Sequence, residues 1–262
     1  MNFSRQFYYL ETNAIIALTT SEIRKLSNRD IYTSSFALIE FLKGTNNKNY
    51  LQKKNKVEAI YNNLKIDWYT TTEKITTMYN YIKIQDNLEY KDHLEPLIIK
   101  IMECSNYEEL INKIDKDINT TFEEIDEIYK RIKYIMDKIL SGEEIYKIIE
   151  NVILCPECFF AVGVQNKLKQ KHLRESKEEY KKIILSYNHN ADIFFNCCKY
   201  YYYNYYNNKP NKNDFVDLMH TLYIPNLATA IITNDKKLSK ICKNGAKVKA
   251  ITLNSFKQLV IN

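Results

Sequence analysis

Short apolar runs that end at a carboxylate occur near both ends of the chain. Residues 6–10 lead into Glu11, and the run "AIIT" at 230–233 leads, one residue later, into Asp235. Runs of this length that are rich in β-branched and aromatic residues predict buried β-strands. Further strands are predicted near Ile31–Thr33, at 66–70 and within "KVKAITL" at 247–253.

Helical periodicity follows these strands. Apolar residues spaced three and four positions apart predict helices at 13–28, where Ser21 and Glu22 offer a restart, and from Ser34 or Ser35 to a stop at Gly44. Two more helices are predicted: one that ends near Tyr223, and "DKKLSKICKNG" at 235–245 with Gly245 as its stop. Strands that alternate with helices predict an α/β fold with a parallel sheet flanked by helices in three layers.

The middle of the chain, residues 73–207, has a different pattern. It is helical almost throughout, with Thr72 as a candidate cap, and one apolar stripe comprises Ile125, Ile128, Tyr129, Ile132, Ile135, Met136 and Ile139. We therefore predict a discontinuous α/β domain, 1–72 with 208–262, that is interrupted by an all-helical insertion. The tyrosine-rich segment 199–213 is the best candidate for the boundary.

Composition and charge narrow the class of protein. The chain has 262 residues, of which 45% are hydrophobic, with only 4 Gly and 4 Pro, which favours a large core and long helices. Its net charge of +6 permits contact with a polyanion. A chain this long needs no framework of disulfides from its 6 cysteines. Neither a signal peptide nor a long apolar run is present, so we expect a soluble cytoplasmic protein without membrane contact.

Five carboxylates are candidates for one site. In an open parallel sheet, ligands bind outside the carboxyl ends of the strands, so Glu11 and Asp235 can share a crevice. Glu40 lies on an early helix, and Asp214 and Asp217 share a helix face because they are three positions apart. Carboxylates this close would repel one another, and a divalent cation such as Mg²⁺ resolves the repulsion. The same ion suits phosphodiester hydrolysis.

The order and context of these acids resemble the PIN-domain (PilT N-terminus-like) nucleases. The matching segments are "YLETN", "SSFALIEFLKG" and "NDFVDLMHTLYI…AIITNDKKL", and they fall within residues 5–70 and 211–260. The resemblance implies a parallel sheet between helices and cleavage of single-stranded RNA that depends on Mg²⁺ or Mn²⁺. Residues 73–207 are not explained by it.

The resemblance also assigns residues to roles. It makes Glu11, Glu40, Asp217 and Asp235 the acidic quartet, with Asp214 as a fifth metal ligand. Asn13, Thr233 and Asn234 are then supporting polar residues. The sequence departs from the family at Glu11, because that position is usually Asp.

The expected function is therefore a metal-dependent endoribonuclease, and the class includes toxins restrained by an antitoxin and effectors of phage defence. Two rivals stay open: a PIN-like interaction module with weak or no catalysis, which Glu11 suggests, and a structure-selective DNA nuclease. An antitoxin or other regulatory protein is the expected partner beside RNA, and a homo-oligomer also stays open.

Each feature also has a simpler interpretation. Glu11 and Asp235 could cap helices, Asp214 could complement a helix dipole, and Glu40 could be a solvated helix residue. His220 is expected to pack or hydrogen-bond beside the site. Two other segments carry alternatives of their own.

The first is "CPEC", where Cys155 and Cys158 resemble half a zinc site, with His172, His189, Cys197 and Cys198 as weak partners. Buried free thiols are the preferred interpretation. The second is "KYYYYNYYNNK", which could stack bases or form a helix whose tyrosines pack on the insertion.

Overall fold

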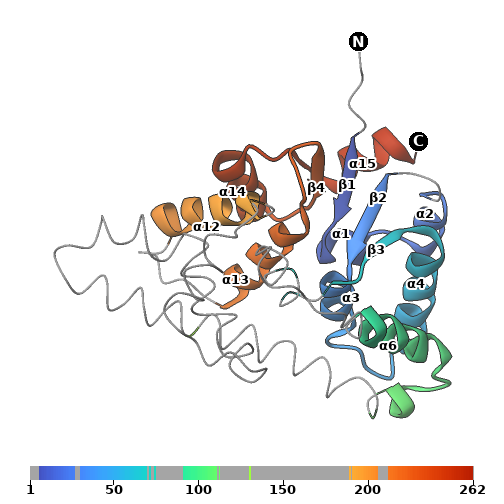
Figure 1. The fold of residues 1–262 in the computed structure, drawn as a ribbon. Helices are drawn as coiled ribbons and strands as arrows, with labels where there is room; N and C mark the ends of the chain where they lie inside the picture. Colours follow the sequence, from blue (N-terminus) through green and yellow to red (C-terminus); the bar gives the residue numbers. More distant parts are fainter. Residues whose placement is uncertain are drawn as a thin grey trace.

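The protein is an α/β fold built on one all-parallel sheet (Figure 1). The computed structural model describes residues 6–26, 30–69, 91–110, 191–205 and 212–261, and a few single residues: Thr71, Lys74, Asn112, Lys130 and His189. Five strands form the sheet in the order β3-β2-β1-β4-β5. They are β1 (Phe7–Leu10), β2 (Ile31–Ser34), β3 (Lys65–Asp67), β4 (Thr229–Ile232) and β5 (Ala250–Ile251).

The first strand occupies the centre of the sheet. β1 pairs with β2 on one side and with β4 on the other, and its register with β4 runs from Phe7 opposite Thr229 to Leu10 opposite Ile232. The prediction that N- and C-terminal segments meet in one sheet is confirmed. β3 belongs to the same sheet but pairs with β2, so it lies at an edge and not beside β1.

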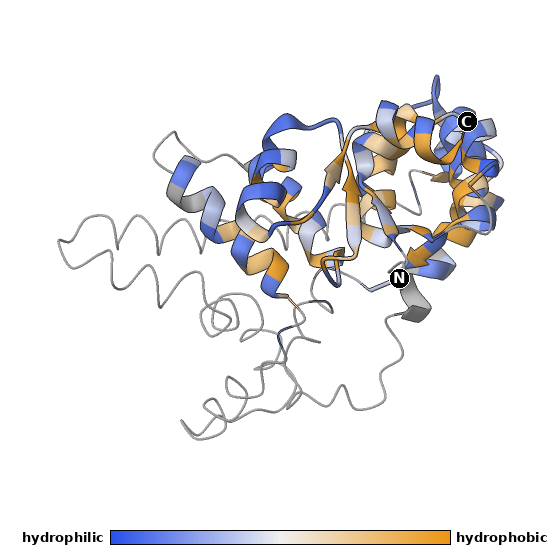
Figure 2. Cartoon of the chain, turned by 90° about the horizontal axis from the view of Figure 1, so that it is seen from above, coloured by the Kyte–Doolittle hydropathy of each residue, from blue (hydrophilic) through white to orange (hydrophobic). Residues whose placement is uncertain are grey.

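Helices lie on both sides of the sheet, with α12 and α14 on one side and α2 and α4 on the other (Figure 1). Their bounds are α1 (Thr12–Ala17), α2 (Thr20–Arg24), α3 (Ser35–Leu42), α4 (Tyr50–Asn63), α6 (Lys91–Glu103), α12 (Asp192–Tyr205), α13 (Lys212–Met219), α14 (Lys236–Ala246) and α15 (Leu253–Val260), with a 3₁₀ turn, η4, at His220–Tyr223. The strands are hydrophobic, and the outer faces of the helices are hydrophilic (Figure 2). Both faces of the sheet are therefore covered, as an all-parallel sheet requires.

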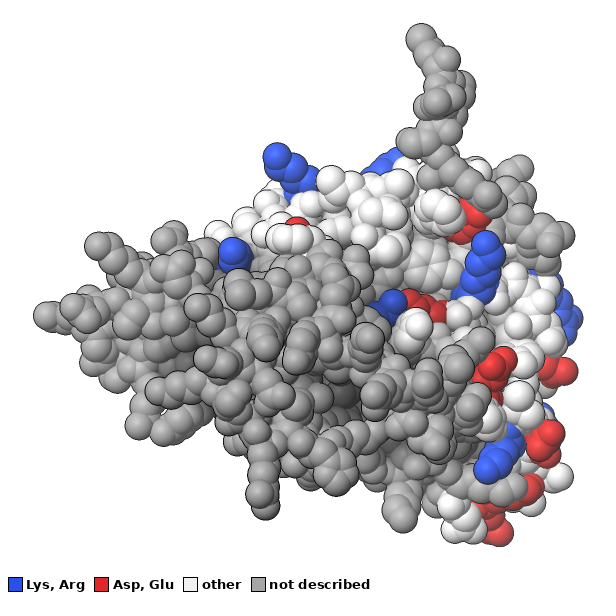
Figure 3. Space-filling view, viewed as in Figure 1, with Lys and Arg blue, Asp and Glu red and all other residues white. Residues whose placement is uncertain are grey.

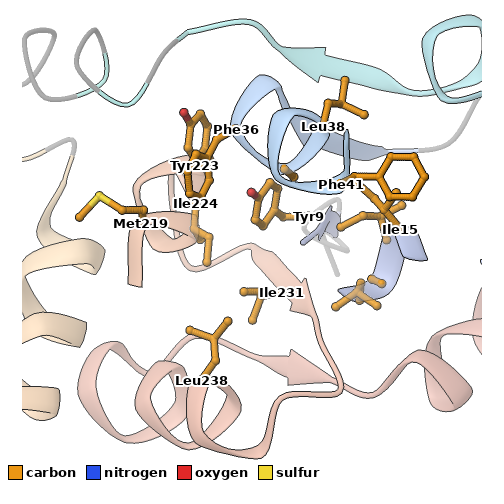
Figure 4. Packing of buried hydrophobic residues seen from close by; sticks show 14 of the residues in the cluster. Tyr9, Ile15, Phe36, Leu38, Phe41, Met219, Tyr223, Ile224, Ile231 and Leu238 are labelled. Carbon is orange, nitrogen blue, oxygen red and sulfur yellow. The ribbon is translucent and has the colours of Figure 1, made fainter. Parts of the chain in front are cut away.

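The core beside the carboxyl end of β1 is aromatic (Figure 4). The ring of Tyr223 is nearly parallel to those of Tyr9 and Phe36, with a centroid separation of 6.2 Å in each pair. All three side chains are buried. Three rings from β1, α3 and η4 thus hold together the elements that carry the candidate site.

The predicted helix 13–28 is two short helices. α1 ends at Ala17, and Thr19 starts α2 by accepting a hydrogen bond from the backbone of Glu22, whose carboxylate accepts one from the Thr19 backbone. This reciprocal capping box moves the restart two residues ahead of the predicted Ser21. The second helix ends at Arg24, and residues 27–29 lie outside the described ranges.

Gly245 does not stop α14, contrary to the prediction. The helix continues through Ala246, and Lys247 ends it in the left-handed region at φ 58°. Gly245 instead lies where α14 meets α12, and a Cβ there would be 2.8 Å from Cβ of Tyr200 and 2.9 Å from the carbonyl oxygen of Asn196. The glycine is therefore needed for the close approach of two helices.

Other elements match the predictions in part. β2, α3 and β4 lie within about a residue of their predicted positions, whereas β3 and β5 are shorter. Helix α13 ends at Met219, and the predicted continuation to Tyr223 is the 3₁₀ turn η4. The sequence pattern did not indicate α4 or α15.

Most of the predicted insertion, including the apolar stripe from Ile125 to Ile139, lies outside the described residues, as does the candidate cap Thr72 just before it. Its described parts, α6 and α12, contribute Ile98, Ile101, Phe194 and Tyr201 to the main hydrophobic core. The division into domain and insertion stays a prediction. Within the described ranges, no helix has the length and apolar character to cross a membrane.

Candidate functional site

Parallel pairing of β1 with β4 brings two carboxylates to one edge of the sheet. Leu10 lies opposite Ile232 at the ends of these strands, so Glu11 and Thr233 leave the sheet side by side. Asp235 follows two residues later. The predicted sharing of one edge by Glu11 and Asp235 therefore has a direct cause in the register of the sheet.

Glu11 is buried and only half satisfied. The residue is 1% exposed, and its Oε2 accepts a hydrogen bond of 2.7 Å from the backbone N–H of Asn13, which caps α1. Its other oxygen, Oε1, has no hydrogen-bond partner among the described residues. Burial raises the pKa of Glu11, opposed by the charge of His220, the Asn13 N–H and the Thr233 hydroxyl. A buried carboxylate oxygen without a partner is costly, so it requires an explanation.

Glu40 reaches the site from α3. That helix begins at Ser34, whose hydroxyl accepts from the backbone N–H of Ala37 at 3.1 Å. The Glu40 carboxylate accepts from Thr12, and its Oε2 lies 3.0 Å from Nε2 of His220. Burial acts to raise the pKa of Glu40, but these partners and the charge of Lys43 hold it below its ordinary value. Glu40 is thus a fixed, ionised carboxylate.

His220 connects Glu40 to the core. The residue is 1% exposed, and its Nδ1 lies 2.8 Å from the hydroxyl of Tyr9, which in turn lies 2.9 Å from Oγ of Ser34. Burial acts to lower the pKa of His220, yet Glu40, then Glu11 and Asp217, raise it above its ordinary value. The buried imidazole therefore lies among the acids, which favour its protonated form, and it packs and hydrogen-bonds beside the site as expected. No pattern in the sequence indicated that Tyr9 would join it.

The pKa of Asp217 indicates that the four carboxylates interact electrostatically. Asp217 lies on α13, and its pKa is raised to about 7, first by burial and then by the charges of Asp235, Glu40 and Glu11, against the opposing charge of His220. Like charges raise an acid's pKa only when they are near it. The four acids come from the end of β1, from α3, from α13 and from the start of α14, and they share one electrostatic site.

The residues after β4 have structural contacts. Asp235 caps α14 through a hydrogen bond of 2.6 Å from the N–H of Leu238, and its own N–H donates to the Thr233 hydroxyl at 2.9 Å. Oδ1 of Asn234 accepts from the N–H of Leu253, which fixes β4 to the start of α15. Asn13 contributes its backbone N–H to Glu11, while its side chain is exposed.

Asp214 is engaged with other residues. Its Oδ2 lies 2.7 Å from Nζ of Lys237 and accepts a 2.9 Å hydrogen bond from the hydroxyl of Tyr201. The Lys237 ammonium also lies about 5 Å from the ring centroids of Tyr201 and Tyr205. The described tyrosines of α12 therefore pack against α13 and α14, and Asp214 belongs to that contact.

The donor set of the quartet suits a hard divalent cation, because every candidate ligand is a carboxylate oxygen. Among these carboxylates, Glu11 Oε1 is the buried oxygen without a hydrogen-bond partner at any residue that the structure describes. Within the described residues, however, no three His, Cys, Asp or Glu side chains form a group with the geometry to hold an ion. The four carboxylates interact electrostatically, but their side chains are not arranged as a preformed ion-binding site.

The zinc alternative has no support at the described residues. Cys197 and Cys198 are buried free thiols, and burial raises the pKa of Cys198 far above its ordinary value. The thiol of Cys197 also raises the pKa of Cys242 through a hydrogen bond. Cys155, Cys158 and His172 lie outside the described residues.

Comparison with known proteins gives no match to the chain among protein-family models, curated proteins or solved structures.

Proposed function

We propose that the protein is a metal-dependent endoribonuclease of the PIN type, which hydrolyses phosphodiester bonds in single-stranded or structured RNA. One observation carries the proposal: the carboxylates of Glu11, Glu40, Asp217 and Asp235 share one field at the carboxyl edge of a parallel sheet. The four acids come from separate elements. Bringing like charges together costs free energy, and such clusters of acids with shifted pKa values are typical of functional sites.

The donor chemistry of these residues suits Mg²⁺ or Mn²⁺, although the described side chains do not form a preformed ion site. Glu11 Oε1 is buried and has no hydrogen-bond partner in the part of the chain that the structure describes, and an ion beside it would offset both its desolvation and the repulsion from the other acids. Glu11, Asp217 and Asp235 are the proposed ligands, together with Glu40. When bound, such an ion activates water for attack on the phosphodiester and stabilises the leaving oxygen.

The chain's own groups prepare the site in different ways. His220 and Thr12 hold Glu40 ionised and oriented. The pKa of Asp217 is raised to about 7, so near neutral pH part of its population carries a proton, and the pKa of Glu11 is also raised above its ordinary value. Metal binding must release that proton, and we expect metal affinity to rise with pH through the neutral range.

The wider architecture is part of the proposal. Residues 1–72 and 208–262 would form the PIN-like domain, and the helical block 73–207 would control access to the site or choice of partner. A role as a toxin held by an antitoxin, or as an effector of phage defence, would follow from the same class.

A cleavage assay tests the proposal. Purified protein should cut a labelled single-stranded RNA in Mg²⁺ or Mn²⁺ and stop when a chelator is added. Asp217→Asn and Asp235→Asn each remove a charge while keeping shape, and each should abolish cleavage. Asp192→Asn makes the same change at an exposed position of α12 and should retain activity. Full activity of Asp217→Asn would overturn the site.

Binding of the ion has a readout that does not need activity. Mn²⁺ should raise the unfolding temperature of the wild type, because a ligand that binds only the folded state stabilises it. The shift should be smaller in Asp217→Asn. Cleavage of the matching DNA strand instead of RNA would favour the DNA-nuclease rival.

An interaction module without catalysis is the second candidate. It is favoured by the N-cap that Glu11 supplies to α1, since a capping carboxylate needs no metal. In that case neither metal-dependent cleavage nor a metal-dependent shift in unfolding temperature would be seen.

A further inference from the structure

The basic charge of the chain is concentrated near its C-terminal end. Residues 236–262 contain seven lysines and no acidic residue. The whole chain has 38 basic and 32 acidic residues, so the first 235 residues hold 31 basic against 32 acidic residues. The net positive charge of the protein therefore comes from residues 236–262, the segment that spans α14, β5 and α15.

Four of these lysines form one stripe. Lys236, Lys240, Lys243 and Lys247 are spaced i, i+4, i+7 and i+11, which places them along one face of α14 and its C-cap. All four are exposed, whereas Leu238, Ile241 and Cys242 on the other face are buried. We call these four residues the α14 lysine stripe. Basic side chains project from the surface in the region of α14 (Figure 3).

Nothing in the described fold accounts for the stripe. None of its four ammonium groups is within ion-pair distance of a carboxylate in the part of the chain that the structure describes, although Lys240 lies 6.0 Å from the ring centroid of Tyr205. Like charges four positions apart destabilise a helix, and Lys236 lies at the helix N-terminus, where a cation opposes the dipole. By contrast, Lys237 and Lys257 in the same segment form ion pairs with Asp214 and Glu22.

The stripe begins beside the candidate site. Lys236 directly follows Asp235, the N-cap of α14, and the charge of Asp235 reaches Asp217. A cluster of carboxylates repels the phosphates of a nucleic acid. A row of lysines that starts at the cluster and leads away along α14 offsets this repulsion for a strand lying on it.

We propose that the α14 lysine stripe binds the phosphodiester backbone of a single-stranded polynucleotide and leads it to the carboxylates. This inference rests on the proposed nuclease function for its geometry, but it predicts binding that can be measured without cleavage. The stripe would contact phosphates and not bases, because four flexible ammonium groups on one helix face provide charge without base-specific hydrogen bonding.

The test is a titration in which cleavage is blocked. Fluorescence anisotropy of a labelled single-stranded RNA is measured with the wild-type protein in EDTA, at several salt concentrations. The variant Lys236→Gln/Lys240→Gln/Lys243→Gln/Lys247→Gln should bind on the order of 10- to 100-fold more weakly at low salt. The slope of log affinity against log salt should fall by about 0.7 for each phosphate that the variant no longer neutralises.

Two matched variants control for charge and folding. Lys25→Gln/Lys48→Gln/Lys65→Gln/Lys100→Gln removes the same charge from exposed lysines elsewhere and should bind nearly as well as the wild type. Arginine at the four stripe positions keeps the charge and should keep the affinity. If both glutamine variants bound RNA equally weakly, or if neither bound it more weakly than the wild type, the proposal that the α14 lysine stripe binds RNA would be wrong.

The outcome separates this inference from the proposed function. Binding through the stripe without metal-dependent cleavage would reject the nuclease and keep the stripe. Cleavage together with normal binding by the stripe variant would reject the stripe alone. The same strand made as DNA distinguishes the source of the phosphates, since preference for the RNA strand identifies RNA as the ligand.

Discussion

The Nε2 atom of His220 lies 3.0 Å from Oε2 of Glu40, a residue 180 positions earlier in the chain. Its other ring nitrogen contacts the Tyr9 hydroxyl, and Tyr9 contacts Ser34, the N-cap of the helix that carries Glu40. A protonated imidazole donates from both nitrogens. His220 therefore fixes Glu40 twice, through the carboxylate and through the start of its helix.

Removing His220 should destabilise the fold. His220→Ala removes this partner from the half-buried Glu40 and the buried Tyr9, and the free energy of unfolding should fall by about 2–4 kcal/mol in urea denaturation. Tyr9→Phe removes a single hydroxyl and should cost roughly 1 kcal/mol. Stability of His220→Ala equal to that of the wild type would show that the network contributes nothing.

The contribution of His220 should depend on pH. Its folded-state pKa is raised above 6.5, so the stability from its charge is fully present below pH 6.5 and is lost as pH rises through the folded-state pKa. The difference in unfolding free energy between wild type and His220→Ala, measured from pH 5.5 upward, should therefore shrink as pH rises, because the contribution of the charge is lost. A difference that widens with pH would contradict this sign.

Asp217→Asn should stabilise the metal-free protein. The unfolded carboxyl loses its proton near 3.8, whereas the folded one holds it to about 7, so folding becomes less favourable as pH rises between these values. Above pH 7 the asparagine variant should be more stable by on the order of 1–3 kcal/mol. Denaturation in EDTA should show this gain at pH 8 and none near pH 3.5. Equal stabilities at pH 8 would mean that Asp217 feels no repulsion.

Gly245→Ala tests the contact between α12 and α14 through the sign of its effect. In an exposed helix, replacing Gly by Ala stabilises by about 1 kcal/mol. Here the new Cβ would lie within 3 Å of Tyr200 and of the Asn196 carbonyl oxygen, so we expect a loss of about 1–3 kcal/mol. The measurement is the thermal unfolding of Gly245→Ala compared with the wild type. A gain in stability would mean that α12 and α14 can move apart to accept the new Cβ.

Glu11→Asp tests the residue at which the sequence departs from the PIN pattern. The shorter side chain retreats by about one C–C bond, and Mg²⁺ holds its ligands at roughly 2.0–2.1 Å with strict geometry. Cleavage should fall by on the order of 10- to 100-fold. Unfolding free energy should stay level or rise, because Asp is the better N-cap for α1.

Metal-titrated cleavage by wild type, Glu11→Asp and Glu11→Gln separates the possibilities. Higher activity in Glu11→Asp would mark a site weakened by glutamate. Unchanged rates in both variants would leave Glu11 outside the chemistry and in its capping role.

The sequence predicted those parts of the fold that local pattern determines. Buried runs located β1, β2 and β4, and the carboxylates after β1 and β4 followed from the rule for parallel sheets. The restart of the helix at Thr19 was missed although Thr19 and Glu22 have the spacing of a capping box, because the prediction placed the restart at Ser21 and Glu22. Gly245 was misread because its neighbours come from α12, about 45 residues earlier, and local pattern carries no information about tertiary packing.

The sequence predicted which acids belong to the candidate site, but it did not predict the hydrogen bonds and ion pairs that hold them. Asp214 and Asp217 look equivalent in sequence, but Lys237 and Tyr201 engage the first. Tyr9 could not be singled out among 22 tyrosines, because its role depends on the position of His220. Long-range hydrogen bonds of this kind leave no periodic signal.

Because β1 lies between β2 and β4, the sheet cannot be completed until late in the synthesis of the chain. Gln6 and Ala228, which flank the starts of β1 and β4, are 222 residues apart. At a synthesis rate of about 5–20 residues per second, β4 is made roughly 10–45 s after β1, and until then the edge of β1 that pairs with β4 has no partner strand. Until then Glu11 and Glu40 lack Asp217, His220 and Asp235. The order of synthesis thus keeps Glu11 and Glu40 away from Asp217 and Asp235 until β4 and the start of α14 have been made.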